Sequence, residues 1–484
     1  MKNINELYNI ENRKIKVLQF GEGNFLRCFV DWIIHKMNKE ESLDFSSNVC
    51  IVQPLDFGMI DRLQAQNGLY TVILEGLLDK KEYVSYDVVD NLADFINQYS
   101  EYDRYLEYAK SEDLEYIISN TTEAGIVLNK DDVDFSKTPA SFPGKLLALL
   151  KTRYDHFNGD KSKGLDIIPC ELIDYNGDNL KKILIELAHI ANLDEAFIDW
   201  VANSNRYYNT LVDRIVPGYP RNQANELWEK FGYVDNMMVK GEPFLLWVIE
   251  DHHNLSAKFP ANKIVDVKFV DDVTLYKVRK VKILNGAHTL MVPVSYLKGN
   301  NTVEETMHDE YISAFVKKFV YDEVIPTIDL PYEDMVNFAE SVFERYENPF
   351  VRHELMSISL NSMTKYKTRI LSSVIDNLNN NKFPVNALYS LAALMIFYKG
   401  ERNGEPIKLS DDQVFLDLYK ELWAKYDGSK ESVSFVVKGI LGLKEHFEYD
   451  LLANNQVVEF VCEAAYQIVT NGIVNDFFKE KCNL

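Results

Sequence analysis

The sequence predicts an α/β protein in which an N-terminal Rossmann-like dinucleotide-binding domain precedes a mainly α-helical C-terminal domain. Strand-like and helix-periodic runs alternate over residues 1–276, which is typical of a parallel sheet covered by helices. Residues 277–484 are dominated by helix-periodic runs. A chain of 484 residues is long enough for both domains to bury cores of their own.

Composition narrows the class of function. A formal net charge of −22 argues against a nucleic acid or an anionic membrane as partner, because both attract basic surfaces. The 5 cysteines are scattered without a CxxC motif, which fits a reducing cytoplasm better than a disulfide framework. We find neither a signal-peptide core nor the run of about 20 apolar residues that a membrane span needs. We therefore expect a cytoplasmic protein, a monomer or small homo-oligomer, that acts on a small molecule.

The first strand and the glycine turn after it predict a cofactor site. The run KIKVLQF predicts a buried strand, GEGNF a turn, and LRCFVDWIIHKMN a helix. Gly21 allows a sharp turn, and Gly23 lets the backbone approach a pyrophosphate at the helix start. Leu26 occupies the third glycine position of GxGxxG, so the match is incomplete. The predicted cofactor-binding stretch comprises Leu18, Gln19, Phe20, Gly21, Glu22, Gly23, Asn24, Phe25, Leu26, Arg27, Cys28 and Phe29.

Later strand ends extend this prediction. Asp56 follows the strand-like run SNVCIVQ. It could bind the hydroxyls of the adenosine ribose and would then repel a 2′-phosphate. The alternative is an ordinary loop aspartate. Asn120 and Thr121 follow the run LEYIISN, where cofactor contacts are expected at the sheet edge. The runs YTVILEGLL and EYVSYDVVD predict two strands of a hairpin. We predict no metal site, because adjacent histidines at His252 and His253 point apart and zinc-ligand spacing is absent from the sequence.

The nine residues KVKILNGAH, Lys280 to His288, carry the predicted chemistry. On one apolar-periodic helix Asn285 and His288 share a face, and Lys280 lies about 140° away but has a long stem. An amine, an amide and an imidazole aimed at one point can handle a carbonyl oxygen and its proton. The alternative is a solvated helix face. We expect this segment at the seam between the domains, where ligand clefts form.

The spacing K-x4-N-x2-H, together with LQFGEGNFLRCFVDW, NTLVDRIVPGYP and NPFVRHELMSISLNSMTKYK, resembles the polyol-specific long-chain dehydrogenases. This family includes mannitol dehydrogenase and hexuronate reductases, and the resemblance spans nearly the whole chain. Leu26 replaces the histidine of the family's G-x-G-x-F-H-R turn, which favours the branch that reduces tagaturonate. The alternatives are a fructuronate (mannonate) or mannitol oxidoreductase, or a non-catalytic sensor of NADH and a sugar acid.

The resemblance implies NAD-dependent reduction of a keto-hexuronate without a metal. It implies that Lys280 is the general acid, that Asn285 and Asn176 form an oxyanion hole, and that His288 positions the substrate. Asp213 would bind substrate hydroxyls. Carboxylate binding has three candidates: Arg352, His353 and Lys365. We expect Arg352 to begin a helix, which would favour an anion there; the alternative is a local pair with Glu354 or Glu347.

Overall fold

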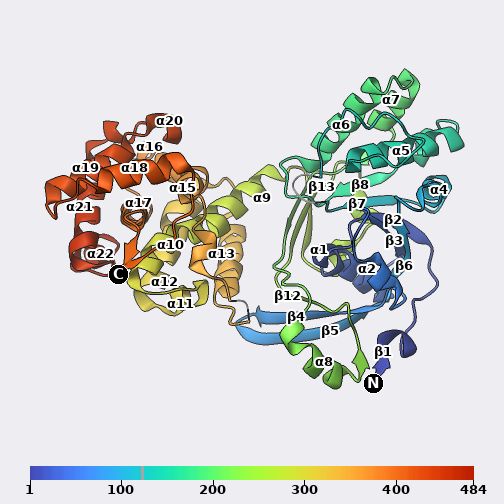
Figure 1. Ribbon diagram of the computed structural model, residues 1–484, viewed down its shortest axis with the longest axis horizontal. Helices are drawn as coiled ribbons and strands as arrows, with labels where there is room; N and C mark the ends of the chain where they lie inside the picture. The colour runs from blue at the N-terminus through green and yellow to red at the C-terminus, as the bar shows by residue number, and fades with distance from the viewer. Residues whose placement is uncertain (122–124, 351) are drawn as a thin grey trace. The chain divides into compact units, whose positions relative to one another are not determined.

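The computed structural model describes residues 1–121, 125–350 and 352–484. The chain divides into two compact units. The first unit contains residues 1–78 and 82–273, and the second contains residues 79–81 and 274–484 (Figure 1).

A parallel sheet of six strands, in the order β6-β3-β2-β7-β8-β9, forms the centre of the first unit. Its strands are β2 (Ile15–Phe20), β3 (Asn48–Gln53), β6 (Leu92–Asn97), β7 (Tyr116–Ser119), β8 (Asp166–Pro169) and β9 (Arg206–Tyr207). Each pairing along this sheet is parallel. This is the strand order of the dinucleotide-binding fold, with its reversal between β2 and β7. The Rossmann-like prediction is confirmed.

Helices cover both faces of this sheet because successive strand residues point to opposite sides. Val17 and Val49 pack with α2 (Val30–Lys39), whereas Leu18 and Cys50 belong to the core under the other helices. Those helices are α4 (Tyr102–Glu107), α5 (Phe142–His156), α6 (Asn176–Ile190) and α7 (Glu195–Asn203). Figure 1 shows α2 on one side of the strands and α5, α6 and α7 on the other.

Besides the two-stranded pairing of β1 (Lys2–Asn3) with β11 (Tyr233–Val234), the first unit has two sheets of three strands. One has the order β12-β4-β5, and the other has the order β10-β13-β14. Their strands are β4 (Tyr70–Leu78), β5 (Lys81–Val89), β10 (Thr210–Asp213), β12 (Val239–Gly241), β13 (Leu246–Glu250) and β14 (Val267–Val270). Between β4 and β5 both Asp79 and Lys80 have positive φ, 53° and 59°, as the central residues of a tight hairpin turn require.

The second unit is mainly helical, as predicted. Its longest helices are α10 (Gly286–Lys298), α13 (Tyr332–Tyr346), α17 (Val385–Phe397), α18 (Gln413–Trp423), α19 (Lys430–Leu441) and α21 (Asn455–Asn471). Helix α17 is buried along its whole length and packs against α10 and α21. Shorter helices complete the unit: α9 (Thr274–Arg279), α11 (Val303–His308), α12 (Glu310–Lys318), α16 (Ser372–Asn379), α20 (Lys444–Phe447) and α22 (Asp476–Lys481).

Two segments predicted as single helices are each broken. The first helix is split into α1 (Asn24–Arg27) and α2, because Phe29 adopts a non-helical backbone at φ −127° and ψ −87°. The segment from Arg352 is split into α14 (Leu355–Ile358) and α15 (Ser362–Tyr366), and Asn361 between them has a φ of 53°. Arg352 therefore does not begin a helix, and that prediction was wrong.

Candidate cofactor and catalytic sites

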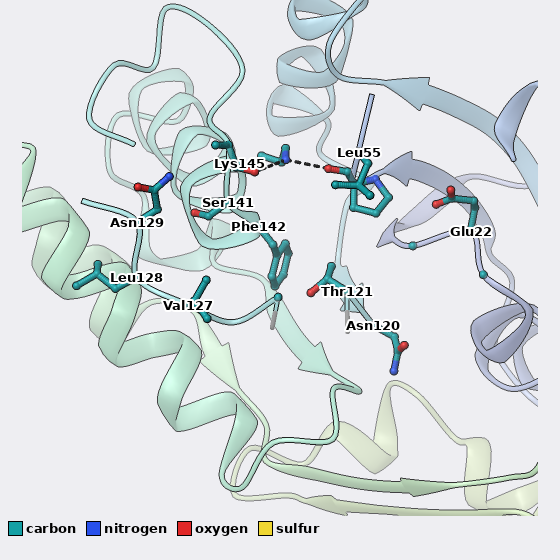
Figure 2. Close-up of a pocket in the computed structure, with 15 residues that line it drawn as sticks. Glu22, Leu55, Asn120, Thr121, Val127, Leu128, Asn129, Ser141, Phe142 and Lys145 are labelled. Atoms are coloured by element: carbon teal, nitrogen blue, oxygen red, sulfur yellow. Dashed lines mark hydrogen bonds between the residues drawn. The ribbon is translucent and has the colours of Figure 1, made fainter. Parts of the chain in front are cut away.

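A cavity of about 670 Å³ opens at the carboxyl ends of β2, β3 and β7, beside the point where the strand order reverses. Ligands of open α/β sheets bind at this point of the sheet. Its lining residues are Gly21, Glu22, Gly23, Pro54, Leu55, Asn120, Thr121, Gly125, Val127, Leu128, Asn129, Ala140, Ser141, Phe142 and Lys145 (Figure 2). Five of the predicted cofactor-binding residues, Gly21, Glu22, Gly23, Asn120 and Thr121, are therefore brought together here.

The two glycines of the turn serve different purposes. Gly21 has a φ of +123°, a conformation that side chains rarely adopt, and a Cβ there would lie 3.0 Å from the carbonyl oxygen of Asn120. Gly23 precedes α1 and has no heavy atom within 4 Å of the position a Cβ would take. Gly21 thus allows β2 and β7 to approach each other, and Gly23 leaves space at the cavity wall.

Buried Glu171 holds the loop after β7. The Glu171 carboxylate accepts hydrogen bonds from the Thr121 backbone N–H at 2.9 Å, the Thr121 hydroxyl at 2.9 Å and the Ser119 hydroxyl at 3.0 Å. Burial raises the pKa of Glu171, and these donors oppose the rise. The Asn120 amide donates to the Cys170 carbonyl at 2.7 Å. The polar side chains at this strand end are therefore fixed by the protein itself.

Lys145 in α5 lines the same cavity, although we did not predict a role for it. Its ammonium donates to the carbonyl oxygens of Pro54 at 2.9 Å and Ala140 at 2.8 Å (Figure 2). It also donates to the Tyr99 hydroxyl at 3.2 Å. Burial lowers the pKa of Lys145 to about 8. Three acceptors match the three donors of an ammonium, so Lys145 ties the end of β3 to the start of α5.

Glu22 lines the cavity, whereas Asp56 does not. Glu22 is largely buried in the cavity wall and accepts a hydrogen bond from the Met59 backbone N–H at 3.3 Å. Burial raises the pKa of this carboxyl. Asp56 is exposed, its carbonyl accepts from the Asn97 amide at 3.3 Å, and it is absent from the lining residues. The structure places its neighbours Pro54 and Leu55 at the cavity instead.

The rest of the predicted cofactor-binding stretch lies outside the cavity lining. Arg27, for example, is buried, and its guanidinium donates to the carbonyl oxygens of Glu22 at 3.1 Å and Met237 at 2.6 Å. Asn24 accepts from Arg27 at 2.7 Å, and Phe25 stacks on Phe29. The residues that are buried in this way are Leu18, Gln19, Phe20, Leu26, Arg27, Cys28 and Phe29. These residues shape the turn from within the core.

Asn176, predicted for the oxyanion hole, is fully buried at the start of α6. Its amide nitrogen lies within hydrogen-bonding distance of the carbonyls of Pro169 and Glu171 and of the Thr210 hydroxyl, at 3.0–3.1 Å. Its side-chain oxygen accepts the backbone N–H of Gly177 and Thr210. These bonds use the hydrogen-bonding capacity of the amide within the fold. We therefore do not carry Asn176 into the proposed mechanism. Asp213 is partly exposed at the end of β10.

The Lys280–His288 segment is helical but not uniformly α-helical. Lys280–Asn285 forms the π-helix η7 between α9 and α10, and the Gly286 N–H donates to the Val281 carbonyl five residues back. In a π-helix residues i and i+5 lie about one turn apart, whereas an α-helix would separate Lys280 and Asn285 by about 140°. The α-helical prediction was wrong in this detail, and the correction brings the amine and the amide toward one face.

His288 lies on the next turn in a cationic environment. Its ring packs against Tyr346, with centroids 4.3 Å apart, and edge-on against His353 at 5.0 Å. Its Nε2 is buried and has no hydrogen-bond partner in the described ranges 1–121, 125–350 and 352–484. Burial lowers the pKa of His288 well below its usual value, and the charges of His353, Arg345, Arg369 and Lys365 lower it further. The imidazole is therefore neutral near neutral pH.

The three candidate carboxylate-binding residues are placed differently. Arg352 is exposed, and its guanidinium pairs with Glu354 at 2.5 Å, as the alternative interpretation anticipated. His353 is partly buried against His288, and burial lowers its pKa. Lys365 is partly buried, and its ammonium donates to the Ile358 carbonyl at 2.8 Å. Of the three, His353 and Lys365 lie near His288, and Arg352 is held by a local ion pair.

Neither a metal centre nor a membrane-spanning helix adds a further site among the described residues. Among these residues we find no group of three or more His, Cys, Asp or Glu side chains that could hold a metal ion. No helix in the same residues is long and apolar enough to cross a membrane.

The parallel sheet with its reversal point is the arrangement of a dinucleotide-binding domain, and the helical unit bears Lys280, Asn285 and His288. The Mannitol dehydrogenase Rossmann domain model matches residues 15–263, and the Mannitol dehydrogenase C-terminal domain model matches residues 272–469. The chain belongs to the mannitol dehydrogenase family.

Curated relatives and solved structures agree with this assignment. The chain is 44% identical to an altronate oxidoreductase of Enterobacter sp. (strain 638) over 462 residues, 95% of each chain. It is 43% identical to the altronate oxidoreductase of Shigella flexneri over 95% of each chain. A D-sorbitol dehydrogenase structure in substrate-free form has a TM-score of 0.80 at 19% identity, covering 96% of each chain. The ternary complex of Pseudomonas fluorescens mannitol 2-dehydrogenase with NAD and D-mannitol has a TM-score of 0.68 at 21% identity, covering 98% of this chain and 95% of that one.

Proposed function

We propose that this protein is an NAD-dependent reductase that converts tagaturonate to altronate. The full-length identity of 44% to an altronate oxidoreductase carries the proposal. The order of strands around the cavity and the spacing of Lys280, Asn285 and His288 support the same reaction type. Residues 1–276 would bind the cofactor, and residues 277–484 would bind the substrate and supply the catalytic groups.

The cavity residues fit a dinucleotide. Gly21 and Gly23 keep the turn after β2 free of side chains, and a pyrophosphate could approach the backbone there. When bound, the reduced nicotinamide would supply the hydride. We propose NADH over NADPH, because the donors of Lys145 are taken by protein oxygens and Asp56 would repel a 2′-phosphate. Similar kcat/KM values for NADH and NADPH would contradict this preference.

In the second unit the proposed roles are a proton donor and an oxyanion stabiliser. Lys280 would protonate the carbonyl oxygen as negative charge develops on it. The Asn285 amide would donate a hydrogen bond to this oxygen, a type of contact worth about 3–4 kcal/mol in other enzymes. Neutral His288, with its buried Nε2, would hold the substrate in place. In altronate oxidation Lys280 would accept the proton.

The proposal is tested by NADH oxidation with purified protein and four ketoses: tagaturonate, fructuronate, fructose and fructose 6-phosphate. We expect the highest kcat/KM for tagaturonate. The reverse reaction with altronate and NAD should reduce NAD at alkaline pH, because proton release is then favoured. Preference for fructuronate or fructose would assign the chain to another activity of the family. NADH binding without turnover of any ketose would favour a sensor.

A further inference from the structure

Two cations on one helical run form no ion pair within the described residues, although the charge of Asp411 acts on Lys365. Lys365 lies in α15, and Arg369 lies in the π-helix η10 (Lys367–Leu371) that continues it. Both side chains are partly buried, and neither forms an ion pair with any residue the structure describes. Burial of an unpaired charge is costly, and like charges four residues apart on a helix repel each other. The arrangement is thus unfavourable until an anion joins it.

Neighbouring cations in the same unit are neutralised by the protein. Lys367, two residues from each, pairs with Glu448 at 2.7 Å. Lys282, in the facing π-helix η7, pairs with Asp376 at 3.1 Å. The chain has 74 acidic and 52 basic residues, so acidic partners are abundant. The lack of a counter-charge at Lys365 and Arg369 is therefore a local property of this surface rather than a shortage of acids.

Close backbone packing places Arg369 beside the catalytic segment. A Cβ on Gly286 would lie 3.3 Å from the Arg369 carbonyl oxygen, so Gly286 lets η10 approach α10 closely. The Arg369 Nη1 donates to the Thr289 hydroxyl at 3.2 Å, and this hydroxyl donates to the Asn285 carbonyl at 2.9 Å. The Arg369 guanidinium is thus held at Thr289, about one helical turn (roughly 5.4 Å) beyond Asn285, and its charge acts on His288.

We propose that Arg369, together with Lys365, binds the carboxylate of the keto-hexuronate. This inference rests on the proposed function and names the residues that distinguish a uronate from a neutral ketose. A carboxylate would supply the missing negative charge, and the planar guanidinium fork can hold both of its oxygens. The carbonyl and carboxylate of a hexuronate are separated by several carbon atoms. Arg369 contacts Thr289, about one helical turn beyond Asn285, so the amide and the guanidinium can meet different ends of such a ligand.

The test compares Arg369→Met and Lys365→Met with the matched control Lys367→Met. Each variant loses one positive charge from the same helical run, but Lys367 faces Glu448. We expect Arg369→Met to raise KM for tagaturonate at least tenfold and Lys365→Met to raise it several-fold. Lys367→Met should change it less than twofold. The catalytic efficiency of Arg369→Met with tagatose, which has a hydroxymethyl group in place of the carboxylate, should stay within about threefold of wild type.

A binding measurement covers the case in which tagatose is not reduced. In the presence of NADH, altronate cannot be oxidised, and its affinity can be measured by calorimetry beside that of the neutral polyol altritol. Arg369→Met should weaken altronate binding at least tenfold and leave altritol unchanged, and Arg369→Lys should recover part of the loss. If Arg369→Met weakened the binding of altronate and altritol equally, or left KM for tagaturonate unchanged, the carboxylate-binding role would be overturned and the proposed function would stand. A wild-type protein that reduces no keto-hexuronate would overturn the proposed function as well.

Discussion

The candidate cofactor cavity and the surroundings of His288 differ in how their polar groups are satisfied. In the cavity, Thr121 and Lys145 already donate to protein oxygens. Around His288, the buried Nε2 has no partner among the described residues, and Lys365 and Arg369 form no ion pair there. Where the side chains already make their hydrogen bonds within the protein, a ligand is recognised by the shape of the cavity and by backbone groups. Where polar or charged side chains lack partners, a ligand must supply the missing hydrogen bonds and charges. The predictions below test this contrast.

The largest effect is expected from Lys280→Ala. Loss of a positioned general acid should lower kcat for ketone reduction by about 10²–10⁴-fold. NADH affinity, followed by fluorescence titration, should remain within about twofold, because the proposed cofactor site is in the first unit. The matched control is Lys282→Ala, since Lys282 pairs with Asp376 and Thr327. Near-normal turnover by folded Lys280→Ala protein would refute the catalytic role.

Alanine substitutions at Gly21 and Gly23 should have different effects, because only Gly21 has a backbone conformation and surroundings that exclude a side chain. Gly21→Ala forces a side chain into φ +123° and against the Asn120 carbonyl, a strain of about 1–3 kcal/mol. We expect NADH binding to weaken about tenfold and the thermal midpoint to fall. Gly23→Ala meets open space and should leave the thermal midpoint unchanged. Equal thermal midpoints for both variants would contradict the role of Gly21.

Glu171→Ala tests whether internal hydrogen bonds fix the cavity. The substitution leaves the Thr121 N–H and two hydroxyls without their acceptor, at a cost of about 1–3 kcal/mol per buried group. We expect a lower free energy of unfolding and severalfold weaker NADH binding. Glu171→Gln keeps one acceptor oxygen and should lose less in both measurements. If both variants lost the same unfolding free energy and the same NADH affinity, the hydrogen bonds accepted by the Glu171 carboxylate would not be what fixes the cavity.

The smallest effect concerns Glu22 and pH. Burial raises the pKa of this carboxyl above its usual 4.5, so it gains a proton at a higher pH than an exposed glutamate does. The ionised form would repel the cofactor phosphates, and NADH should therefore bind more tightly as the pH falls toward that raised pKa. Glu22→Gln should improve affinity about two- to fivefold at neutral pH, in the range of an exposed ion pair. It should also flatten the pH dependence of Kd around the raised pKa of Glu22.

Local patterns were sufficient for much of the fold. Buried parallel strands appear as continuous apolar runs, so β2, β3, β7 and β8 could be predicted from residues such as KIKVLQF. Polar residues after those strands also indicated that the cofactor contacts lie at the carboxyl edge of the sheet. Asn120 and Thr121 line the cavity at that edge. Leu18 and Arg27 were assigned too broadly to the cofactor, because a sequence motif does not distinguish the wall of a cavity from the core beneath it.

The sequence by itself determined the family, the order of elements and the identities of Lys280, Asn285 and His288. The tertiary structure alone decided three things. It made Lys280–Asn285 a π-helix, a choice that depends on packing because π-helices have no strong propensity pattern. It paired Arg352 with Glu354, which neither charge nor spacing could settle. It left Lys365 and Arg369 without an ion pair among the described residues, because whether a charge is paired depends on contacts between elements distant in the chain.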